Sequence, residues 1–414
     1  MHVKIASSGR KPARFVAAAG RRLFAHAQRC PTVDAATKHL AIDPRPRHLR
    51  TMPTAHHILT YAETLSGGGV ERAQLRLARG WIAAGRRVTL VVGDPSGPLA
   101  AELPAGLEIV TGYGRALPGL VRTFAPDILF CAGNHYTGLA AWIRLSLRSH
   151  CPPIVAKMSN APDRGDHGPV MRAAHRVWLA RHGGFLDHLV AMTPATAAQA
   201  AAAMHMPGRV SVIPNPPALP APSAPTLPLP PRFILGVGRL EPQKRWDRLI
   251  AAFARLDDRA VALVILGEGS RRAALEAQVH ALGLADRVHL PGHVADPLPI
   301  MTRARVLALT SDYEGVPGVL REALSVGTPV VATACSHAIP EIVDTASRGT
   351  IVQPDDADAL VTALDAWLAP HRLRPLAVPQ PGSDSPARYL ALFDALVSQP
   401  PSRPHDQTDA PARS

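Results

Sequence analysis

The sequence predicts an α/β protein with two doubly wound, Rossmann-like domains in tandem. From His56 onward, short apolar runs alternate with helical patterns, and the runs lack the polar alternation of a half-exposed strand. A proline-rich stretch over residues 214–231, in which nine of eighteen residues are proline, interrupts this alternation. The alternation then restarts, which predicts a second domain of the same kind.

The first domain is predicted from seven apolar runs. These candidate strands are residues 57–61, 87–92, 107–110, 127–131, 153–158, 188–192 and 210–213. Between the first two runs, apolar residues recur at helical spacing and predict one buried helix face, at Val70, Ala73, Leu77, Ala78 and Trp81. Strands separated by helices favour a parallel sheet that is covered on both faces.

The second domain repeats the pattern. Its candidate strands are residues 233–238, 260–266, 287–290, 305–310, 329–333 and 350–353, and its candidate helices are 246–256, 271–282, 318–326 and 357–368. A final apolar-periodic piece over 387–397 predicts one more short helix.

These patterns give the expected domain boundaries. We expect a disordered basic extension over 1–52, a first domain over 53–215 and a stiff linker over 216–231. A second domain follows over 232–386, a helix over 387–398 that packs back on the first domain, and a disordered tail over 399–414. Ligands of such folds bind at the carboxyl ends of the strands, so a cleft between the domains is the expected site.

The positive charge is concentrated at the start of the chain. The formal net charge is +13, but residues 1–50 hold 11 Lys and Arg against 2 Asp and Glu, and the rest holds 34 against 30. Because no nucleic-acid-binding motif accompanies this charge, we expect no nucleic-acid partner. A basic amphipathic helix over 13–27 could instead contact an anionic membrane, unless the true start is Met52.

Cysteine use and hydropathy indicate a cytoplasmic protein. The cysteines at 30, 131, 151 and 335 form no metal-binding or disulfide pattern, and Cys131 and Cys335 lie in apolar runs that predict buried thiols. The longest apolar stretch, residues 260–266, is far shorter than the ~20 residues of a membrane-spanning helix. The basic N-terminus lacks the apolar core of a signal peptide.

Two cations follow the first strand of the second domain. Gly236 and Gly238 allow a tight turn, and Arg239 and Lys244 leave the same loop before a helix. Two cations near a helix N-terminus suit a diphosphate. The alternative is a solvated pair of surface charges.

Two carboxylates follow a later strand. Glu314 lies on a loop with Gly315, and Glu322 lies about one turn into a helix that begins near Gly318, with Pro317 at its first positions. Two carboxylates beside small residues are suited to accept hydrogen bonds from hydroxyl groups, one at each end of a nucleotide sugar. The alternative is a helix cap with an incidental second glutamate.

Together these segments resemble the retaining glycosyltransferases of family 4, which have the GT-B fold. The family pattern is matched, in order, by VGRLEPQKRWDRLIAAF, LVILGEG and EGVPGVLREALSVGTPVVAT, and the resemblance covers residues 57–367. The resemblance implies two Rossmann-like domains facing each other across a cleft. It also implies transfer of a hexosyl unit from a nucleotide diphosphate sugar (UDP, GDP or ADP) to a glycan or lipid-linked acceptor. Bacterial envelope or exopolysaccharide synthesis, at the inner face of the cytoplasmic membrane, is the implied setting.

The resemblance also implies roles for the matched positions. Arg239 and Lys244 would hold the diphosphate, Glu322 the ribose, and Glu314 the reacting side of the donor sugar. Further donor contacts would come from three backbone segments: Gly67, Gly68 and Gly69; Gly292, His293 and Val294 at the base; and Gly315, Val316, Pro317, Gly318 and Val319.

In the first domain, the family often places a functional histidine at the position of His135, facing the donor sugar, and Asn134 is a competing candidate. Lys157, Thr193 and Asn215 are weaker candidates. Gly318 and Arg321 depart from the family's usual residues, which leaves the sugar preference open.

No cofactor and no metal site are expected. No Asp-x-Asp pattern lies at a strand end in the expected cleft, and the aspartates at 355, 356 and 358 suit a helix cap. Two other functions stay open: another nucleotide-sugar enzyme of this fold, such as an epimerase, and a catalytically idle nucleotide-sugar-binding partner.

Overall fold

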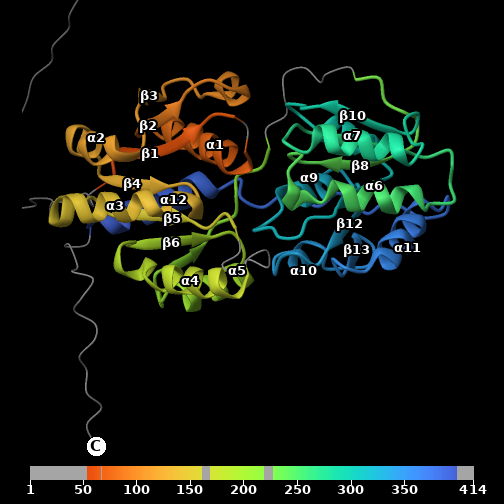
Figure 1. Cartoon of the computed structure of the whole chain (residues 1–414). Coiled ribbons are helices and arrows are strands. Elements are labelled where there is room, and N and C mark those ends of the chain that lie inside the picture. Colours follow the sequence, from red (N-terminus) through yellow and green to blue (C-terminus); the bar gives the residue numbers. More distant parts are fainter. Residues whose placement is uncertain (1–53, 67, 161–167, 219–226, 399–414) are drawn as a thin grey trace, which may run out of the picture. The chain divides into compact units, whose positions relative to one another are not determined.

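The computed structural model describes residues 54–66, 68–160, 168–218 and 227–398 (Figure 1). Two parallel sheets organise these residues. The predicted extension over 1–52, its helix over 13–27, Gly67 and the tail from residue 399 lie outside the described residues.

The first sheet has seven parallel strands in the order β3-β2-β1-β4-β5-β6-β7. The strands are β1 (His57–Thr64), β2 (Arg87–Asp94), β3 (Glu108–Thr111), β4 (Ile128–Cys131), β5 (Ile154–Lys157), β6 (His188–Ala191) and β7 (Val210–Val212). Its helices are α1 (Gly69–Ala83), α2 (Leu117–Phe124), α3 (Thr137–Leu147), α4 (Pro169–Ala180) and α5 (Pro194–Ala203).

The second sheet has six parallel strands in the order β10-β9-β8-β11-β12-β13. The strands are β8 (Phe233–Val237), β9 (Ala262–Leu266), β10 (Val288–Gly292), β11 (Val306–Leu309), β12 (Val330–Thr333) and β13 (Gly349–Val352). Its helices are α6 (Trp246–Ala254), α7 (Arg272–Ala281), α8 (Leu298–Arg303), α9 (Gly318–Ser325), α10 (Ile339–Ile342) and α11 (Ala357–Leu368).

The predicted fold class is confirmed, because both sheets are parallel and doubly wound. In each sheet the strand order reverses beside the first strand, between β1 and β4 and between β8 and β11. Such a reversal point opens a crevice at the carboxyl ends of the strands, where ligands of this architecture bind. The loops after these four strands are therefore the first place to look for a site.

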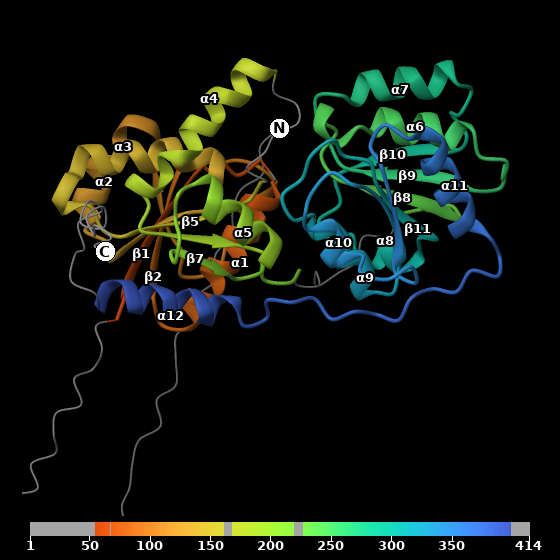
Figure 2. The same cartoon turned by 90° about the horizontal axis from the view of Figure 1, so that it is seen from below.

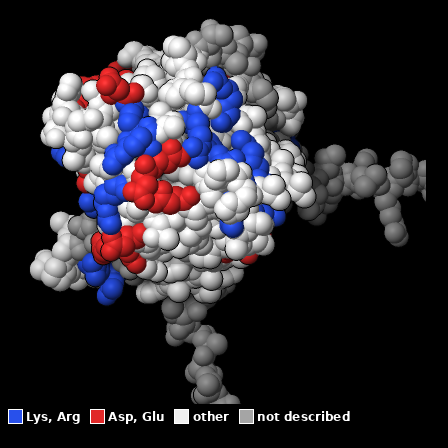
Figure 3. Space-filling model, turned by 90° about the vertical axis from the view of Figure 1, so that its right-hand side faces the viewer, with Lys and Arg blue, Asp and Glu red and all other residues white. Residues whose placement is uncertain are grey.

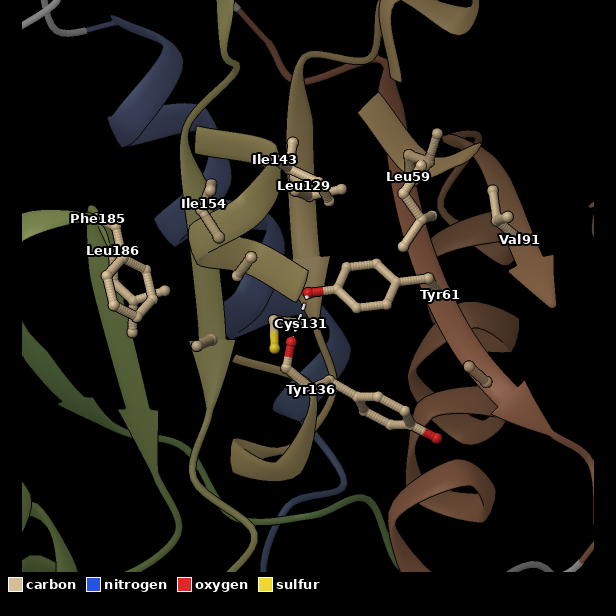
Figure 4. Close-up of a cluster of buried hydrophobic side chains, with 14 of the residues drawn as sticks. Leu59, Tyr61, Val91, Leu129, Cys131, Tyr136, Ile143, Ile154, Phe185 and Leu186 are labelled. Atoms are coloured by element: carbon tan, nitrogen blue, oxygen red, sulfur yellow. Dashed lines mark hydrogen bonds between the residues drawn. The ribbon is translucent and has the colours of Figure 1, made fainter. Parts of the chain in front are cut away.

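Alternate residues of each central strand pack into different layers. Leu59 and Tyr61 of β1 join one cluster of buried side chains, drawn in Figure 4, and Ile58 joins another. The second sheet divides its core in the same way, with Ile234 in one cluster and Leu235 in the other. Helices on both faces explain why the strand sequences read as continuous apolar runs.

The edge strand β3 departs from that expectation. Its residues alternate between half-buried and exposed, and Ile109 is 40% exposed. The cause is its position, since β3 pairs only with β2 in the described sheet. The uniform burial predicted for residues 107–110 is therefore wrong.

The last helix, α12 (Ser385–Ser398), lies against the first sheet on the side of α1 (Figures 1 and 2). Tyr389 and Phe393 are wholly buried there, with ring centroids 5.8 and 5.3 Å from that of Trp81. Phe130 of β4 completes the aromatic group. The chain thus returns from the second sheet to close the core of the first.

Among the described residues, no helix is both long and apolar enough to span a membrane.

Candidate functional site

The loop after β8 carries the two predicted cations and is tightly packed. Gly238 has φ +157°, and a Cβ atom at Gly267 would lie 1.9 Å from the Gly238 carbonyl oxygen. Only glycine at residue 267 allows this approach of the loops after β8 and β9. The chain then turns through the short 3₁₀ segment Pro242–Lys244 into α6.

Lys244 and Glu314 meet, although 70 residues separate them. The Lys244 Nζ donates to Glu314 Oε1 at 2.5 Å, and the Ser311 hydroxyl donates to the same oxygen at 2.7 Å. Both charged side chains are mostly buried, with 15% and 11% exposed. The structure therefore brings two predicted site residues into one ion pair at the carboxyl ends of β8 and β11.

Arg239 lies on the same loop and is exposed. Its carbonyl oxygen accepts a hydrogen bond from the Trp246 indole at 2.9 Å, which fixes the backbone. Within the described residues, its guanidinium has no hydrogen-bond or ion-pair partner. A free, always charged guanidinium on the same loop as Lys244 is suited to bind an anion.

Glu322 lies on α9 and faces the first sheet's helix α1. Its carboxylate is 3.9 Å from the Arg76 guanidinium and accepts no hydrogen bond from a described residue. Burial raises the pKa of Glu322, and the charge of Arg76 opposes that rise. A buried carboxylate with unused acceptor sites is suited to receive hydroxyl groups from a ligand.

The segment from Gly315 to Val319 leads into α9. Pro317 is the N-cap residue and Gly318 the first helical residue, so the prediction that Pro317 occupies the first helical positions is wrong by one residue. Val316 packs against the core of the second sheet, as does Val319.

Gly315 contacts the loop after β5. It pairs with Asn160 in an antiparallel bridge, and a Cβ atom at residue 315 would lie 1.9 Å from the Ser159 carbonyl oxygen. Any side chain there would force the two loops apart. Gly315 therefore has a packing role in addition to the predicted ligand contact.

Asn134 holds that loop in place. Its Oδ1 accepts from the amides of Ser159 and Asn160 and from the Ser159 hydroxyl, and its Nδ2 donates to the Asn160 carbonyl. All four bonds are between 2.8 and 3.0 Å. The amide is thus engaged with the backbone, which makes Asn134 a positioning residue for the Gly315 contact.

His135 follows in the short 3₁₀ segment Asn134–Tyr136, after β4. Its Nε2 is 3.6 Å from Oε1 of Glu71, a residue in the first turn of α1, and its side chain is 45% exposed. The same oxygen accepts the Tyr136 hydroxyl at 2.8 Å. Glu71 is not among the predicted site residues.

The pKa of Glu71 is lowered overall. Burial acts to raise this pKa, and the nearby His135 imidazole and the hydrogen bond from Tyr136 together outweigh that effect. Glu71 is therefore ionised at neutral pH.

The glycine-rich loop before α1 leaves room for the carboxylate of Glu71. Gly68 is the N-cap residue of α1, and a Cβ atom there would lie 2.1 Å from the Glu71 Oε2. Gly69 has open space around its Cβ position. The close approach of the Glu71 carboxylate therefore explains a glycine at residue 68.

Lys157 is buried at the end of β5. Its Nζ donates to Asn215 Oδ1 at 3.0 Å, and burial lowers its pKa to about 8. Thr193, a further candidate, caps α5 through a reciprocal pair of hydrogen bonds with Thr196. Thr193 is therefore engaged in helix capping.

The predicted base-contacting loop starts later than expected. β10 extends to Gly292, which has φ +97°, so Gly292 belongs to the strand and His293 and Val294 begin the loop. A Cβ atom at Gly292 would lie 2.9 Å from Glu268 Oε1, which is paired with Arg272. Burial lowers the pKa of His293.

The scarcity of lysine in the chain is a further sequence signal for this site. The whole chain has five lysines against 40 arginines, and the two lysines within residues 54–398 are Lys157 and Lys244. Both lie at the carboxyl ends of sheet strands, on β5 and after β8. Because arginine is the usual basic residue of this chain, a lysine is unusual. That alone could have identified both positions as candidate site residues.

Of the three aspartates predicted to suit a helix cap, Asp356 caps α11. Asp356 is the N-cap residue of α11, and its Oδ1 accepts from the Ala359 amide at 2.8 Å. Within the described part of the chain, no group of three or more His, Cys, Asp or Glu residues is placed to hold a metal ion. The thiol of Cys131 is buried as predicted, whereas Cys335 is only half-buried.

Charges of both signs share the surface drawn in Figure 3. Basic and acidic side chains lie next to one another on that face. The second domain also contains ion pairs such as Arg255–Asp358 and Arg248–Asp312.

Two family models match the chain side by side. Residues 67–219 match the model described as Glycosyltransferase Family 4, and residues 222–374 match the model described as Glycosyl transferases group 1. The chain belongs to the family 4 glycosyltransferases. The motifs that carried the resemblance all lie within these two matches.

The curated relatives of this glycosyltransferase match part of its length. An N-acetylgalactosaminyltransferase of Campylobacter jejuni that acts on a diphospho-undecaprenol acceptor is 34% identical over 34% of this chain and 39% of its own. A putative colanic acid biosynthesis glycosyltransferase of Escherichia coli is 33% identical over 34% of this chain and 37% of its own. The chain thus spans about two fifths of these relatives' length.

Solved structures show that the glycosyltransferase has the GT-B fold. HepE of Anabaena, solved with UDP-glucose, has a TM-score of 0.62 at 19% identity, over 83% of this chain and 98% of its own. The apo form of the lipopolysaccharide outer core galactosyltransferase WaaB has a TM-score of 0.57 at 19% identity, over 83% and 97%.

Proposed function

We propose that the chain transfers a hexosyl unit from a nucleotide diphosphate sugar to a glycan or lipid-linked acceptor, with retention at the anomeric carbon. The observation that carries this proposal is the grouping of Arg239, Lys244 and Glu314 at the carboxyl ends of β8 and β11. It supplies two cations for a diphosphate and one carboxylate beside the position of the sugar.

The cations act on the leaving group in this proposal. Negative charge builds on the diphosphate as the glycosidic bond breaks, and preorganised cations stabilise that charge. Lys244 has three donors, of which the Glu314 bond uses one. Arg239 and Lys244 can thus neutralise the diphosphate themselves, and we propose that transfer needs no divalent metal.

The remaining candidate residues would contact the ribose, the sugar and the base of the donor. Glu322 would accept the ribose hydroxyls, which would compensate its buried and otherwise unbonded carboxylate. The backbone of Gly315 to Val319 would meet the phosphate and sugar, and His293 and Val294 would lie at the base. His135, half-exposed after β4, would face the sugar from the first sheet.

The names of the relatives guide the choice of substrates. UDP-glucose is bound by HepE, so UDP-sugars are the first donors to test, with GDP- and ADP-sugars as alternatives. Relatives named for diphospho-undecaprenol, lipopolysaccharide core and colanic acid indicate an acceptor of the bacterial envelope. We place the reaction in the cytoplasm at the inner membrane face, where residues 1–52 would contact anionic lipid.

A ligand screen tests donor binding first. Thermal unfolding is measured with UDP, GDP, ADP and their sugar conjugates, without metal and then with Mg²⁺. A ligand at 100 times its dissociation constant adds about 2.7 kcal/mol of apparent stability. A shift with one nucleotide in the absence of metal is expected. Folded protein that shifts with no nucleotide would count against the transferase and favour another role.

The substitution Lys244→Ala tests the leaving-group role. Loss of one such group costs about 10²–10³ in rate, so turnover of the selected donor should fall at least a hundredfold. Arg255→Ala is the matched control, because Arg255 is a paired surface cation of the same domain. A Lys244→Ala enzyme that keeps more than about a tenth of wild-type turnover would contradict the role. NMR of the first product then reports whether the anomeric configuration is retained.

A further inference from the structure

We infer that Glu71 is a positioning residue, which orients the imidazole of His135 so that Nε2 keeps its proton and Nδ1 accepts a sugar hydroxyl. The inference rests on the proposed function, because it assigns a partner to the histidine that faces the donor sugar. It concerns a residue that the motifs left without a role. Glu71 touches the histidine, not the substrate.

The carboxylate of Glu71 is held in one place. Its Oε1 accepts the Tyr136 hydroxyl at 2.8 Å, and its side chain is only 14% exposed. The Tyr136 hydroxyl in turn accepts from the Glu63 amide at 3.3 Å. A carboxylate with such a fixed partner has little freedom to reorient.

Tyr136 itself is anchored in the core of the first domain. Figure 4 shows it beside Tyr61, whose hydroxyl donates to the Tyr136 carbonyl oxygen at 3.2 Å. The two rings meet edge to face with centroids 5.9 Å apart. The position of Glu71 is therefore set by the buried cluster beneath β1 and β4.

The glycine at residue 68 completes the arrangement. Because a Cβ atom there would lie 2.1 Å from Glu71 Oε2, a side chain at residue 68 would displace the carboxylate from its place over the start of α1. The glycine-rich loop thus makes room for the protein's own carboxylate. This explains Gly68 without requiring a ligand phosphate at that residue.

His135 presents one nitrogen to this carboxylate. Nε2 is 3.6 Å from Glu71 Oε1, and the ring lies against the Tyr136 ring with centroids 3.8 Å apart. A carboxylate near one ring nitrogen favours the tautomer with the proton on that nitrogen. Nδ1 is then the acceptor, and the half-exposed ring can offer it to a hydroxyl group.

Two other titratable groups act on Glu71 from neighbouring elements. Lys157 of β5 interacts with it electrostatically, and so does Tyr113 after β3. Neither donates a hydrogen bond to Glu71 among the interactions of the described residues. The direct partners of the carboxylate are Tyr136 and His135.

A double-mutant cycle tests whether Glu71 acts through His135. Glu71→Gln, His135→Asn and the double variant are compared in kcat and donor KM. We expect Glu71→Gln to lower kcat at least tenfold, with donor KM and Tm close to those of the wild type. In the His135→Asn background, the same change should alter kcat less than twofold. A full additional loss in that background, or wild-type kcat in Glu71→Gln, would overturn the inference.

Glu108→Gln is the matched control. Glu108 is also a paired carboxylate of the first sheet, but it lies at the amino end of β3, the opposite edge from the site. Its kcat should equal that of the wild type. If Glu71→Gln does not fold, Tyr136→Phe removes the hydroxyl that holds the carboxylate and should lower kcat in the same direction.

A measurement without turnover separates this inference from the proposed function. In protein labelled with ¹⁵N in the histidine rings, the His135 resonances are assigned by their loss in His135→Asn. At pH 8.5 we expect the Nε2–H tautomer in the wild type and a mixture in Glu71→Gln. An inactive wild type with this pattern would refute the transferase and keep the pairing. A wild type with the Nδ1–H tautomer would refute the pairing.

Discussion

At the scale of single residues, the two lysines of the described chain have opposite surroundings. Lys244 lies on the loop after β8, is 15% exposed and is paired with the carboxylate of Glu314. Lys157 is almost completely buried, and its one hydrogen bond goes to the neutral amide of Asn215. Burial without a paired carboxylate favours the neutral amine. Lys157 is therefore the residue whose titration should be visible in the stability of the protein.

We predict that Lys157 makes stability rise with pH above about 8. Its pKa is about 8 in the folded protein, against an ordinary value of 10.5, so the unfolded chain binds more protons between these values. Across that window the free energy of unfolding should rise by roughly 2 kcal/mol relative to Lys157→Met, which cannot titrate. Urea unfolding at pH 7, 8, 9 and 10 measures the difference. Parallel curves would show that Lys157 is solvated in the native protein.

At the scale of elements, α12 contributes both an aromatic core and an unpaired polar atom. Tyr389 and Phe393 pack against Trp81 and Phe130. Within the described residues, the Tyr389 hydroxyl is buried without a hydrogen-bond partner. Burial of an unsatisfied hydroxyl costs about 1–3 kcal/mol. Apolar contacts thus attach α12 to the first sheet in spite of the buried Tyr389 hydroxyl.

Two substitutions in α12 should have opposite effects on stability. Tyr389→Phe removes the unpaired hydroxyl and should raise the free energy of unfolding by about 1 kcal/mol. Phe393→Ala empties a buried site and should lower it by about 3–5 kcal/mol. Denaturant unfolding monitored by circular dichroism measures both. A loss of stability in Tyr389→Phe would mean that water or another group satisfies the hydroxyl.

At the scale of the whole described unit, three contacts illustrate how side chains and backbone of the two sheet domains meet. Gly315 pairs with Asn160, Arg76 faces Glu322, and Glu341 of α10 accepts from the Ala195 amide at 2.8 Å. The last contact places a carboxylate at the N-terminus of α5, where the helix dipole favours negative charge. Two of the three contacts thus involve residues that would also serve the donor.

The Glu341 contact predicts a local change in hydrogen exchange. Glu341→Ala leaves the Ala195 amide without its acceptor, so the first turn of α5 should exchange faster. Mass spectrometry of a peptide that covers residues 193–198 measures the rate. Glu276→Ala, which removes a surface carboxylate of α7, is the control and should leave that rate unchanged. Equal rates in all three proteins would mean that the contact does not form in solution.

The sheets could be predicted from the sequence, because strands buried on both faces are continuous apolar runs. Every predicted strand lies within three residues of an observed one at either end, and the largest error is at the end of β1, where Glu63 is exposed and Thr64 half-buried. The late end of β10 was missed because Pro291 and Gly292 suggest a turn, although here they extend an edge strand.

The contacts of the candidate site could be predicted only in part. Arg239, Lys244 and Glu314 share known motifs, and the parallel sheet brings them to one edge. The role of Asn134 depends on which backbone amides lie around it, and that is decided by the loop after β5. Glu71 was missed for the same reason, since its partners Tyr136 and His135 come from a distant part of the chain. Such pairings are set by tertiary structure and leave no local pattern.

The scarcity of lysine has a practical consequence for chemical probes of this glycosyltransferase. Within residues 54–398, an amine-selective reagent has two ε-amino targets, and Lys157 is almost inaccessible to it. Covalent labelling of that region should therefore concentrate on Lys244 and slow when a diphosphate covers its amine. Within residues 54–398, Lys244 is thus the more accessible of two amines and lies where the donor's charge is proposed to bind.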